Sequence, residues 1–220
     1  MVAGMRAVTR PVLGVLLAGG QARRMGGGDK CLRLLAGQTL LDRIVARIRP
    51  QVAGLLLNAN GDPARFAATG LPVAADAVPG YAGPLAGVLT GMEWAAAHAP
   101  DCPWVLTVPT DAPFLPLDLA GRLLASVEVA GADMACAVSD GRTHPVVGLW
   151  PVRLAPALRQ AMTVEDIRKV DLWTGRYRLA EAAWPSTPVD PFFNANRPDD
   201  LAVAEAILNE RGSSHSGHDA

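Results

Sequence analysis

The sequence contains few cysteines, and they do not form a pattern typical of a disulfide framework. There are three, Cys31, Cys102 and Cys136, and no two of them form a CxxC pair. Widely spaced cysteines in odd number fit reduced thiols better than a disulfide scaffold or a cysteine zinc site. The four histidines show no metal-ligand spacing either. We therefore expect no structural disulfide and no zinc site.

The sequence also lacks long apolar runs and a strong net charge. No apolar stretch approaches the roughly 20 residues that a helix needs to cross a bilayer. The basic residues Arg6 and Arg10 precede an apolar stretch that ends in glycines and not in a cleavage site. A formal net charge of −1 gives no overall attraction to nucleic acid. These features predict a soluble, cytoplasmic protein with no membrane or nucleic-acid partner, which binds any anion at a local site.

Hydrophobic residues make up 50% of the chain, enough for a full core, and they alternate between short runs and helical patterns. Short apolar runs predict buried strands. These runs lie at residues 12–18, 54–58, 72–75, 104–108, 132–138, 146–150 and 177–183. Helical spacing predicts helices that begin at Thr39, Gly83 and Pro116, a short helix over 164–172, and a last helix between Pro198 and Gly212.

This alternation is typical of an α/β fold with a mainly parallel, twisted sheet and helices on both faces. The sequence shows no internal repeat and no linker that would divide it. We expect a single domain over residues 1–212. Residues 213–220 are small and polar, and we expect them to form a disordered tail.

A glycine-rich loop follows the first predicted strand, with the sequence LAGGQARRMGGGDK at residues 17–30. Its glycines let the backbone approach a phosphate, and Arg23, Arg24 and Lys30 add cations that a triphosphate would attract. The alternative is a flexible surface loop that happens to be basic. Because Cys31 follows Lys30, the loop is not a GxxxxGK[ST] P-loop, and it is not a GxGxxG fingerprint either.

The pattern LAGGxxxRMGxxDK resembles the signature of the molybdenum cofactor guanylyltransferase family, which is part of the Rossmann-like nucleotidyltransferases. Further motifs of this family follow in the same order, so that the resemblance covers residues 12–210. They are NAN at 58–60, Asp76, GPLAG at 83–87, PTD at 109–111, HP at 144–145 and FNAN at 193–196. Two positions depart from the family pattern: Arg197 replaces a common Thr, and Thr110 replaces a frequent Cys or Val.

The resemblance implies a reaction and a nucleotide site. The reaction is the transfer of GMP from GTP to molybdopterin (Mo-molybdopterin), which releases pyrophosphate and gives the molybdopterin guanine dinucleotide cofactor. Ligands of open parallel sheets bind beyond the carboxyl ends of the strands, where the matched motifs lie. The residues that the resemblance assigns to GTP binding are Leu17, Ala18, Gly19, Lys30, Asn58, Asp76 and Asp111. Which of Asn58 and Asp76 contacts the base and which the sugar is left open.

The resemblance assigns catalysis to Lys30, Arg24 and Asp111. Nucleotidyl transfer depends mainly on positioning and on neutralising charge, so cations and carboxylates carry it. Lys30 and Arg24 would clamp the phosphates, although Arg24 could instead form a salt bridge that shapes the loop. Asp111 would hold Mg²⁺, for which Mn²⁺ can substitute. The alternative for Asp111, the N-cap of a following helix, fits less well with Pro113 and Pro116.

On the pterin side, the matching residues are Gly83, His144, Asn194 and Asn196. Each also has a structural alternative: a tight turn at Gly83, a structural role for His144, and a helix cap at Asn196. The substrates would be GTP and molybdopterin, and molybdenum-insertion proteins and molybdoenzyme chaperones are candidate protein partners.

Two other functions compete with this assignment. A cytidylyltransferase or another nucleotidyltransferase of the same fold would conserve most of the site, but the cytidylyl branch tends to carry LAAG where this chain has LAGG. Gly19 leaves more room for a purine, which favours GTP over CTP. A non-catalytic nucleotide-binding adaptor would be expected to lack a charged site residue, yet Lys30 and Asp111 are both present.

Overall fold

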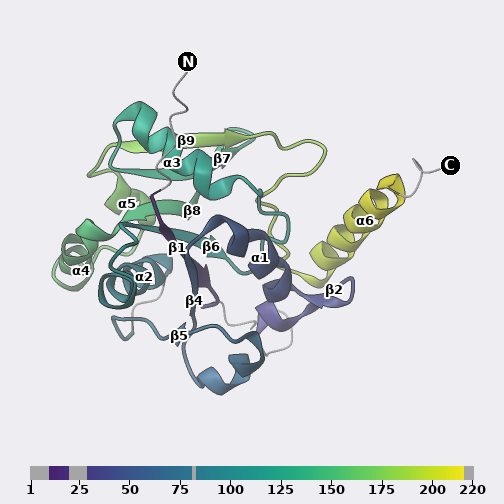
Figure 1. Ribbon diagram of the computed structural model, residues 1–220, viewed down its shortest axis with the longest axis horizontal. Helices are drawn as coiled ribbons and strands as arrows, with labels where there is room; N and C mark the ends of the chain where they lie inside the picture. The colour runs from purple at the N-terminus through teal and green to yellow at the C-terminus, as the bar shows by residue number, and fades with distance from the viewer. Residues whose placement is uncertain (1–9, 20–28, 81–82, 216–220) are drawn as a thin grey trace, which may run out of the picture.

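The computed structural model describes residues 10–19, 29–80 and 83–215. A seven-stranded sheet runs through its centre in the order β5-β4-β1-β6-β8-β7-β9 (Figure 1). Its strands are β1 (Val12–Leu17), β4 (Gly54–Asn58), β5 (Val73–Ala74), β6 (Trp104–Pro109), β7 (Met134–Ser139), β8 (Arg142–Pro151) and β9 (Leu179–Trp184). β1 is parallel to β4 and β6, β4 to β5, and β7 to β9. Only β8 runs antiparallel to its neighbours in this sheet, so the expected mainly parallel sheet is confirmed.

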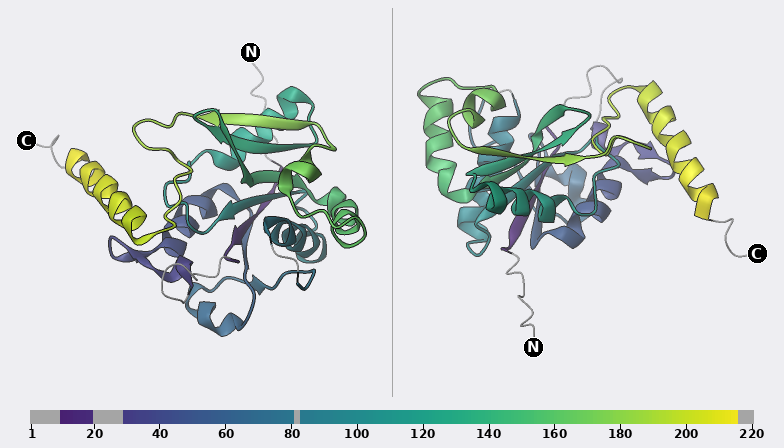
Figure 2. Two further views of the ribbon diagram at one scale, coloured as in Figure 1. Left: turned by 180° about the vertical axis from the view of Figure 1, so that it is seen from behind. Right: turned by 90° about the horizontal axis from the view of Figure 1, so that it is seen from above.

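Helices cover both faces of the sheet, as the two views in Figure 2 show. They are α1 (Leu40–Ile48), α2 (Pro84–His98), α3 (Leu119–Ala130), α4 (Ala155–Thr163), α5 (Val170–Thr174) and α6 (Pro198–His215). Alternate residues of β1 point to opposite faces. Leu16 joins the apolar layer under α1 and α3, whereas Val15 joins the layer under α2 and α4. The sheet is therefore buried on both sides, as continuous apolar strands require.

Short elements complete the chain around this core. They are the 3₁₀ turns η1 (Lys30–Leu32), η2 (Arg49–Gln51), η3 (Pro63–Thr69) and η4 (Val152–Leu154), and a small hairpin of β2 (Leu34–Leu35) and β3 (Gln38–Thr39). α6 packs on this hairpin, where Ala204 joins a cluster with Leu35 and Phe114, and then extends away from the body of the molecule (Figure 1). Among the described residues, no helix is both long and apolar enough to cross a membrane.

The start of α1 is confirmed in detail. The Thr39 hydroxyl oxygen accepts a hydrogen bond from the Asp42 backbone N–H at 3.0 Å and donates to the Asp42 carboxylate at 2.7 Å. This reciprocal pair satisfies backbone donors that the first turn of a helix leaves free. Leu41, Ile44 and Ile48 are fully buried, as their spacing predicted.

The predicted start of α3 at Pro116 is wrong, because the helix begins at Leu119. The side-chain amide of Gln51 causes the difference. Its Nε2 donates to the Pro116 carbonyl at 2.9 Å, and its Oε1 accepts from the Ala120 backbone N–H at 3.0 Å. A side chain from η2 thus holds the preceding residues in a loop and supplies the cap of α3.

The single helix predicted over residues 164–172 is also wrong. α4 ends at Thr163 and α5 begins at Val170. Asp166 adopts a left-handed backbone conformation (φ 53°), and the Ile167 N–H bonds back to the Ala161 carbonyl at 3.0 Å. This is the geometry with which a helix commonly ends, and it separates the two helices.

The last helix also differs from the prediction at its end. α6 does not stop at Gly212 but continues to His215, since a glycine weakens a helix without always ending it.

Candidate functional site

Three sequence motifs meet because three parallel strands end at the same edge of the sheet. Leu17, the last residue of β1, lies in register with Asn58 on one side and with Pro109 on the other. Beyond the strands, the Ala18 N–H donates to the Asn58 carbonyl at 2.9 Å, and the Thr110 N–H donates to the Leu17 carbonyl at 3.3 Å. This carboxyl edge is where open parallel sheets bind ligands.

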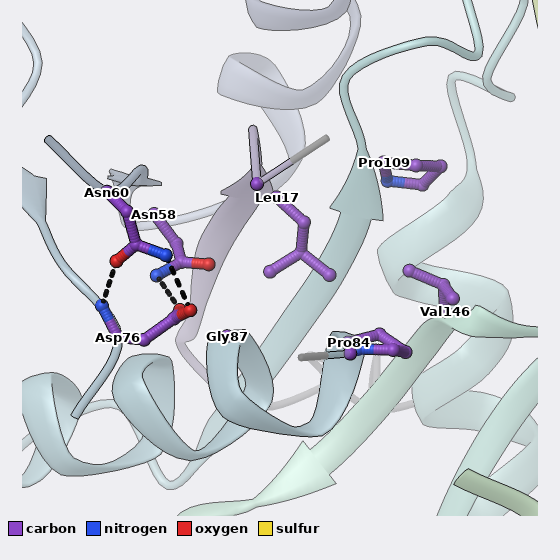
Figure 3. Close-up of a pocket in the computed structure, with 10 residues that line it drawn as sticks. Leu17, Asn58, Asn60, Asp76, Pro84, Gly87, Pro109 and Val146 are labelled. Carbon is purple, nitrogen blue, oxygen red and sulfur yellow. Dashed lines mark hydrogen bonds between the residues drawn. The ribbon is translucent and has the colours of Figure 1, made fainter. Parts of the chain in front are cut away.

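A pocket of about 370 Å³ opens at this edge, between the strand ends and the start of α2 (Figure 3). Its volume lies in the range of small-molecule sites. The lining residues are Leu17, Gly19, Asn58, Asn60, Asp76, Gly83, Pro84, Gly87, Pro109 and Val146. The pocket therefore contains most of the residues that the resemblance assigned to the nucleotide.

Asn58, Asn60 and Asp76 form a polar cluster in this pocket, with their side chains pointing toward one another (Figure 3). The Asp76 carboxylate accepts from Asn58 Nδ2 at 3.0 Å and from Asn60 Nδ2 at 2.7 Å. Asn60 Oδ1 in turn accepts from the Asp76 backbone N–H at 2.9 Å. These bonds fix the orientation of two amides and a carboxylate, which are groups able to recognise a base or sugar directionally.

Gly87 allows α2 to approach the strand ends closely. A Cβ at this position would lie 2.4 Å from Asn58 Oδ1 and 2.5 Å from Leu17 Cδ2, so only glycine fits. Gly83, which precedes the helix, has a φ of 135°, a conformation that glycine adopts readily and other residues do not. Pro84 begins α2, so the helix N-terminus and its positive dipole end border the pocket.

A charged cluster lies beyond the end of β6 and unites distant parts of the chain. Lys30 Nζ lies 2.6 Å from Asp111 Oδ2 and donates to Asn196 Oδ1 at 2.5 Å. The lysine comes from η1, the aspartate follows β6, and the asparagine precedes α6. The Ala195 N–H donates to the Asp111 carbonyl at 2.8 Å and so holds the third segment in place. The Lys30 and Asp111 side chains are 14% and 23% exposed, which leaves both accessible to a ligand.

His144 makes contacts beside this segment. Its Nε2 lies 2.7 Å from Ser139 Oγ, and its ring stacks at an angle on Phe192, with the ring centroids 4.6 Å apart. Ser139 Oγ donates to Asp190 Oδ1 at 2.9 Å, and the same oxygen accepts from the Phe192 N–H. Burial lowers the pKa of His144, although the Asp190 carboxylate opposes the shift. These contacts connect the β7–β8 hairpin to the segment that carries Asn194 and Asn196.

The structure brings the predicted site residues together in two groups. The first lies in the pocket, with Leu17, Gly19, Asn58, Asp76 and Gly83, and the second is the cluster of Lys30, Asp111 and Asn196. Asn194 is exposed in the segment before Asn196, and Ala18 continues the backbone from β1 toward the pocket. Arg24 lies outside the described residues.

Asn60 and Val146 line the pocket without having been assigned a role from the sequence. Asn60 could have been found from its spacing. Residues two apart in an extended chain point to the same side, so the NAN motif places Asn58 and Asn60 side by side.

Asp111 is the residue of this site that best suits a divalent cation. Magnesium takes few protein ligands, typically one or two carboxylates, and completes its shell with phosphate and water oxygens. Within the described residues, no group of three or more His, Cys, Asp or Glu side chains could form an all-protein metal cage. A single accessible carboxylate beside a pocket matches the first arrangement.

Comparisons with known proteins agree with this geometry. A family model described as the MobA-like NTP transferase domain matches residues 14–177. The molybdenum cofactor guanylyltransferase of Bradyrhizobium sp. (strain ORS 278) is 57% identical over 199 residues, which cover 90% of this chain and 94% of that protein.

Two solved structures share the fold. One is the molybdopterin-guanine dinucleotide biosynthesis protein A from Archaeoglobus fulgidus, with a TM-score of 0.70, 22% identity and coverage of 90% of this chain and 99% of that one. The other is a Mycobacterium tuberculosis protein in complex with manganese, with a TM-score of 0.64, 16% identity and coverage of 89% and 98%. From the family match and the high identity to its relatives, the chain belongs to the MobA-like NTP transferases and, within them, to the molybdenum cofactor guanylyltransferase family.

Proposed function

We propose that this protein transfers GMP from GTP to molybdopterin, releasing pyrophosphate and forming molybdopterin guanine dinucleotide. The observation that carries the proposal is the position of the Lys30–Asp111 pair two residues beyond Pro109, which lines the pocket. A nucleoside-sized pocket and a charged cluster therefore share one edge of the sheet, as a nucleoside triphosphate would need. The 57% identity to a relative named for this activity supports the same assignment.

The pocket would hold the guanosine. Guanine offers N–H donors at one end, and these need acceptors such as the Asp76 carboxylate and the Asn58 side-chain oxygen. Asn58 is 3% exposed and Asp76 accepts from both neighbouring amides, so neither acceptor can turn freely. A pocket with oriented acceptors discriminates between bases better than a mobile charge does.

The charged cluster would hold the triphosphate. Lys30 supplies a compact positive charge whose position is fixed by Asp111 and Asn196. Asp111 would hold Mg²⁺, and Mn²⁺ could replace it; the bound cation would neutralise charge on the phosphates. Arg24, in the adjoining loop, is proposed as a second phosphate ligand. In the reaction, an oxygen of the terminal phosphate of molybdopterin forms a bond to the α-phosphorus of GTP while the bond from that phosphorus to pyrophosphate breaks.

The acceptor would approach from the side of the segment before α6. Asn194 and Asn196 are exposed there, Gly83 borders the pocket, and His144 supports the segment through Phe192. We propose these four residues as the pterin side of the site. Molybdenum-insertion proteins and molybdoenzyme chaperones are the protein partners we propose for delivery of the pterin and for its release.

The test is a reaction of purified protein with Mg²⁺, molybdopterin and either GTP or CTP, in which pyrophosphate and the dinucleotide product are measured. We expect product from GTP, little from CTP, and none after chelation of the metal. Equal use of the two nucleotides would favour the cytidylyl or general nucleotidyltransferase alternative. Nucleotide binding without any product would favour the adaptor.

A further inference from the structure

Arg65 is a cation of η3 that lies near the nucleotide site but is not one of the residues assigned to it. Its Nε is 3.0 Å from Asp29 Oδ2, and its Nη2 donates to the Asn60 backbone carbonyl. The planar guanidinium can serve two acceptors at once. A Cβ on Gly61 would lie 3.1 Å from Arg65 Nη1, and Gly61 has a φ of 88°, so the backbone beside the arginine suits glycine on both counts.

Both partners of Arg65 adjoin groups that the proposed function requires. Asp29 directly precedes Lys30, the phosphate ligand, in the sequence. Asn60 exchanges two hydrogen bonds with Asp76, at 2.7 Å and 2.9 Å, in the nucleoside pocket. One side chain therefore connects the phosphate-binding segment to the nucleoside-binding cluster.

The charge of Asp29 makes this connection important for an anionic ligand. The Asp29 side chain is 20% exposed and belongs to the residue next to Lys30. Without a partner, its carboxylate would repel a triphosphate and would compete with it for the lysine ammonium group. The Arg65 guanidinium neutralises that carboxylate and holds it at the η3 side, while Lys30 contacts Asp111.

We propose that Arg65 is a positioning residue for GTP, acting through Asp29 and Asn60 without being a catalytic residue. It keeps Asp29 from opposing the triphosphate, and it fixes Lys30 relative to the Asn60–Asp76 pair so that one nucleotide reaches both. The inference rests on the proposed function, because it takes GTP as the ligand of the site.

The test is isothermal titration of Mg²⁺–GTP into wild-type protein, Arg65→Ala and the double variant Asp29→Asn/Arg65→Ala. A lost charge-assisted contact predicts that Arg65→Ala weakens GTP binding about tenfold. Removing the Asp29 charge in the double variant should restore binding to within about threefold of wild type, since the repulsion disappears with the charge. In turnover assays, the Arg65→Ala defect should raise the KM for GTP and leave kcat within about threefold.

A matched control is Arg159→Ala, which breaks another arginine–carboxylate pair. Arg159 donates to both oxygens of Glu93, at 2.6 Å and 2.7 Å, between α4 and α2. Neither residue lines the nucleotide pocket, so GTP affinity should stay within about twofold of wild type. If Arg65→Ala does not fold, as judged by circular dichroism, Arg65→Gln with and without Asp29→Asn gives the same comparison.

The inference is overturned if Arg65→Ala binds GTP within about twofold of wild type, or if Asp29→Asn does not improve binding by the Arg65 variant. Wild-type protein that binds GTP and forms product in either case leaves the proposed function intact. Wild-type protein that does not bind GTP overturns the proposed function and this inference together.

Discussion

Replacing Gly87 by alanine should impair GTP binding much more than it impairs folding. The added Cβ would lie 2.4 Å from Asn58 Oδ1 and 2.5 Å from Leu17 Cδ2, far inside the roughly 3.5 Å contact distance of non-bonded atoms. Both are the ends of side chains, which can move. The substitution therefore displaces two residues that line the pocket while leaving the backbone of α2 in place.

The magnitude follows from the bonds of Asn58. Its Nδ2 donates to the Ala74 carbonyl at 3.2 Å and to Asp76 Oδ1 at 3.0 Å. Losing both costs about 2 kcal/mol, and alanine in place of glycine inside a helix returns about 1 kcal/mol. The net loss of about 1 kcal/mol lowers the Tm of a chain of this size by about 2–4 °C. Loss of the oriented Asn58 and Asp76 should weaken GTP binding at least about tenfold.

The assay compares Gly87→Ala with two other glycine variants by GTP titration and thermal unfolding. Gly91, one turn further along α2, has a Cβ position 2.6 Å from Val15 Cγ2 in the core, so Gly91→Ala should lower Tm without changing GTP affinity. Gly121 in α3 has nothing within 4 Å, and alanine there should raise Tm. Wild-type GTP affinity in Gly87→Ala, within about twofold, would show that this pocket does not hold the nucleoside.

Three further predictions concern the metal ligand, the cysteines and His144. Asp111→Ala should lower turnover on the order of 10²-fold or more, with the circular dichroism spectrum unchanged; magnesium-dependent turnover near the wild-type rate would refute its role. Burial raises the pKa of Cys31 and Cys136 to about 11 each, and Cys102 is also buried, so a thiol reagent at neutral pH should label none of them in folded protein and all of them in guanidinium chloride. Burial lowers the pKa of His144 below its ordinary value of 6.5, so the unfolded state binds more protons, and stability should fall as the pH drops through that value. Denaturant titrations should show a weaker fall in His144→Gln; an identical fall would contradict the shift.

Much of the fold could be predicted because it depends on local patterns. The run at 54–58 forms β4 with the predicted bounds, since apolar residues in a short run bounded by polar ones suit a buried strand. α1 begins at Leu40 with Thr39 as its cap, because the Thr39–Asp42 pair is itself local.

Elements that depend on contacts distant in sequence could not be predicted. The start of α3 is set by Gln51, which lies far back in the chain. The break between α4 and α5 depends on the left-handed conformation of Asp166, which aspartate adopts only in some contexts. The antiparallel β8 did have a local signal. Asp140 and Gly141 both have positive φ, as a two-residue hairpin turn requires, and the Asp-Gly pair is a strong hairpin signal.

The candidate site divides in the same way. The pocket residues follow strand ends, so their meeting at one edge follows from the parallel sheet alone. The contact of Lys30 with Asn196 depends instead on the path of the segment before α6, which the Ala195–Asp111 backbone bond and the Asp190 contacts hold in place. No pattern in the sequence specifies that path.

The central claim is that one edge of the sheet binds GTP, with the nucleoside among Leu17, Asn58 and Asp76 and the triphosphate at Lys30 and Asp111. A crystal structure of the protein with GTP and Mn²⁺, using the anomalous signal of manganese, tests it most directly. We expect the manganese peak at the Asp111 carboxylate, with the phosphates in contact with Lys30 and the guanosine in the pocket. A fully bound nucleotide whose phosphates and metal lie away from both side chains would contradict the claim.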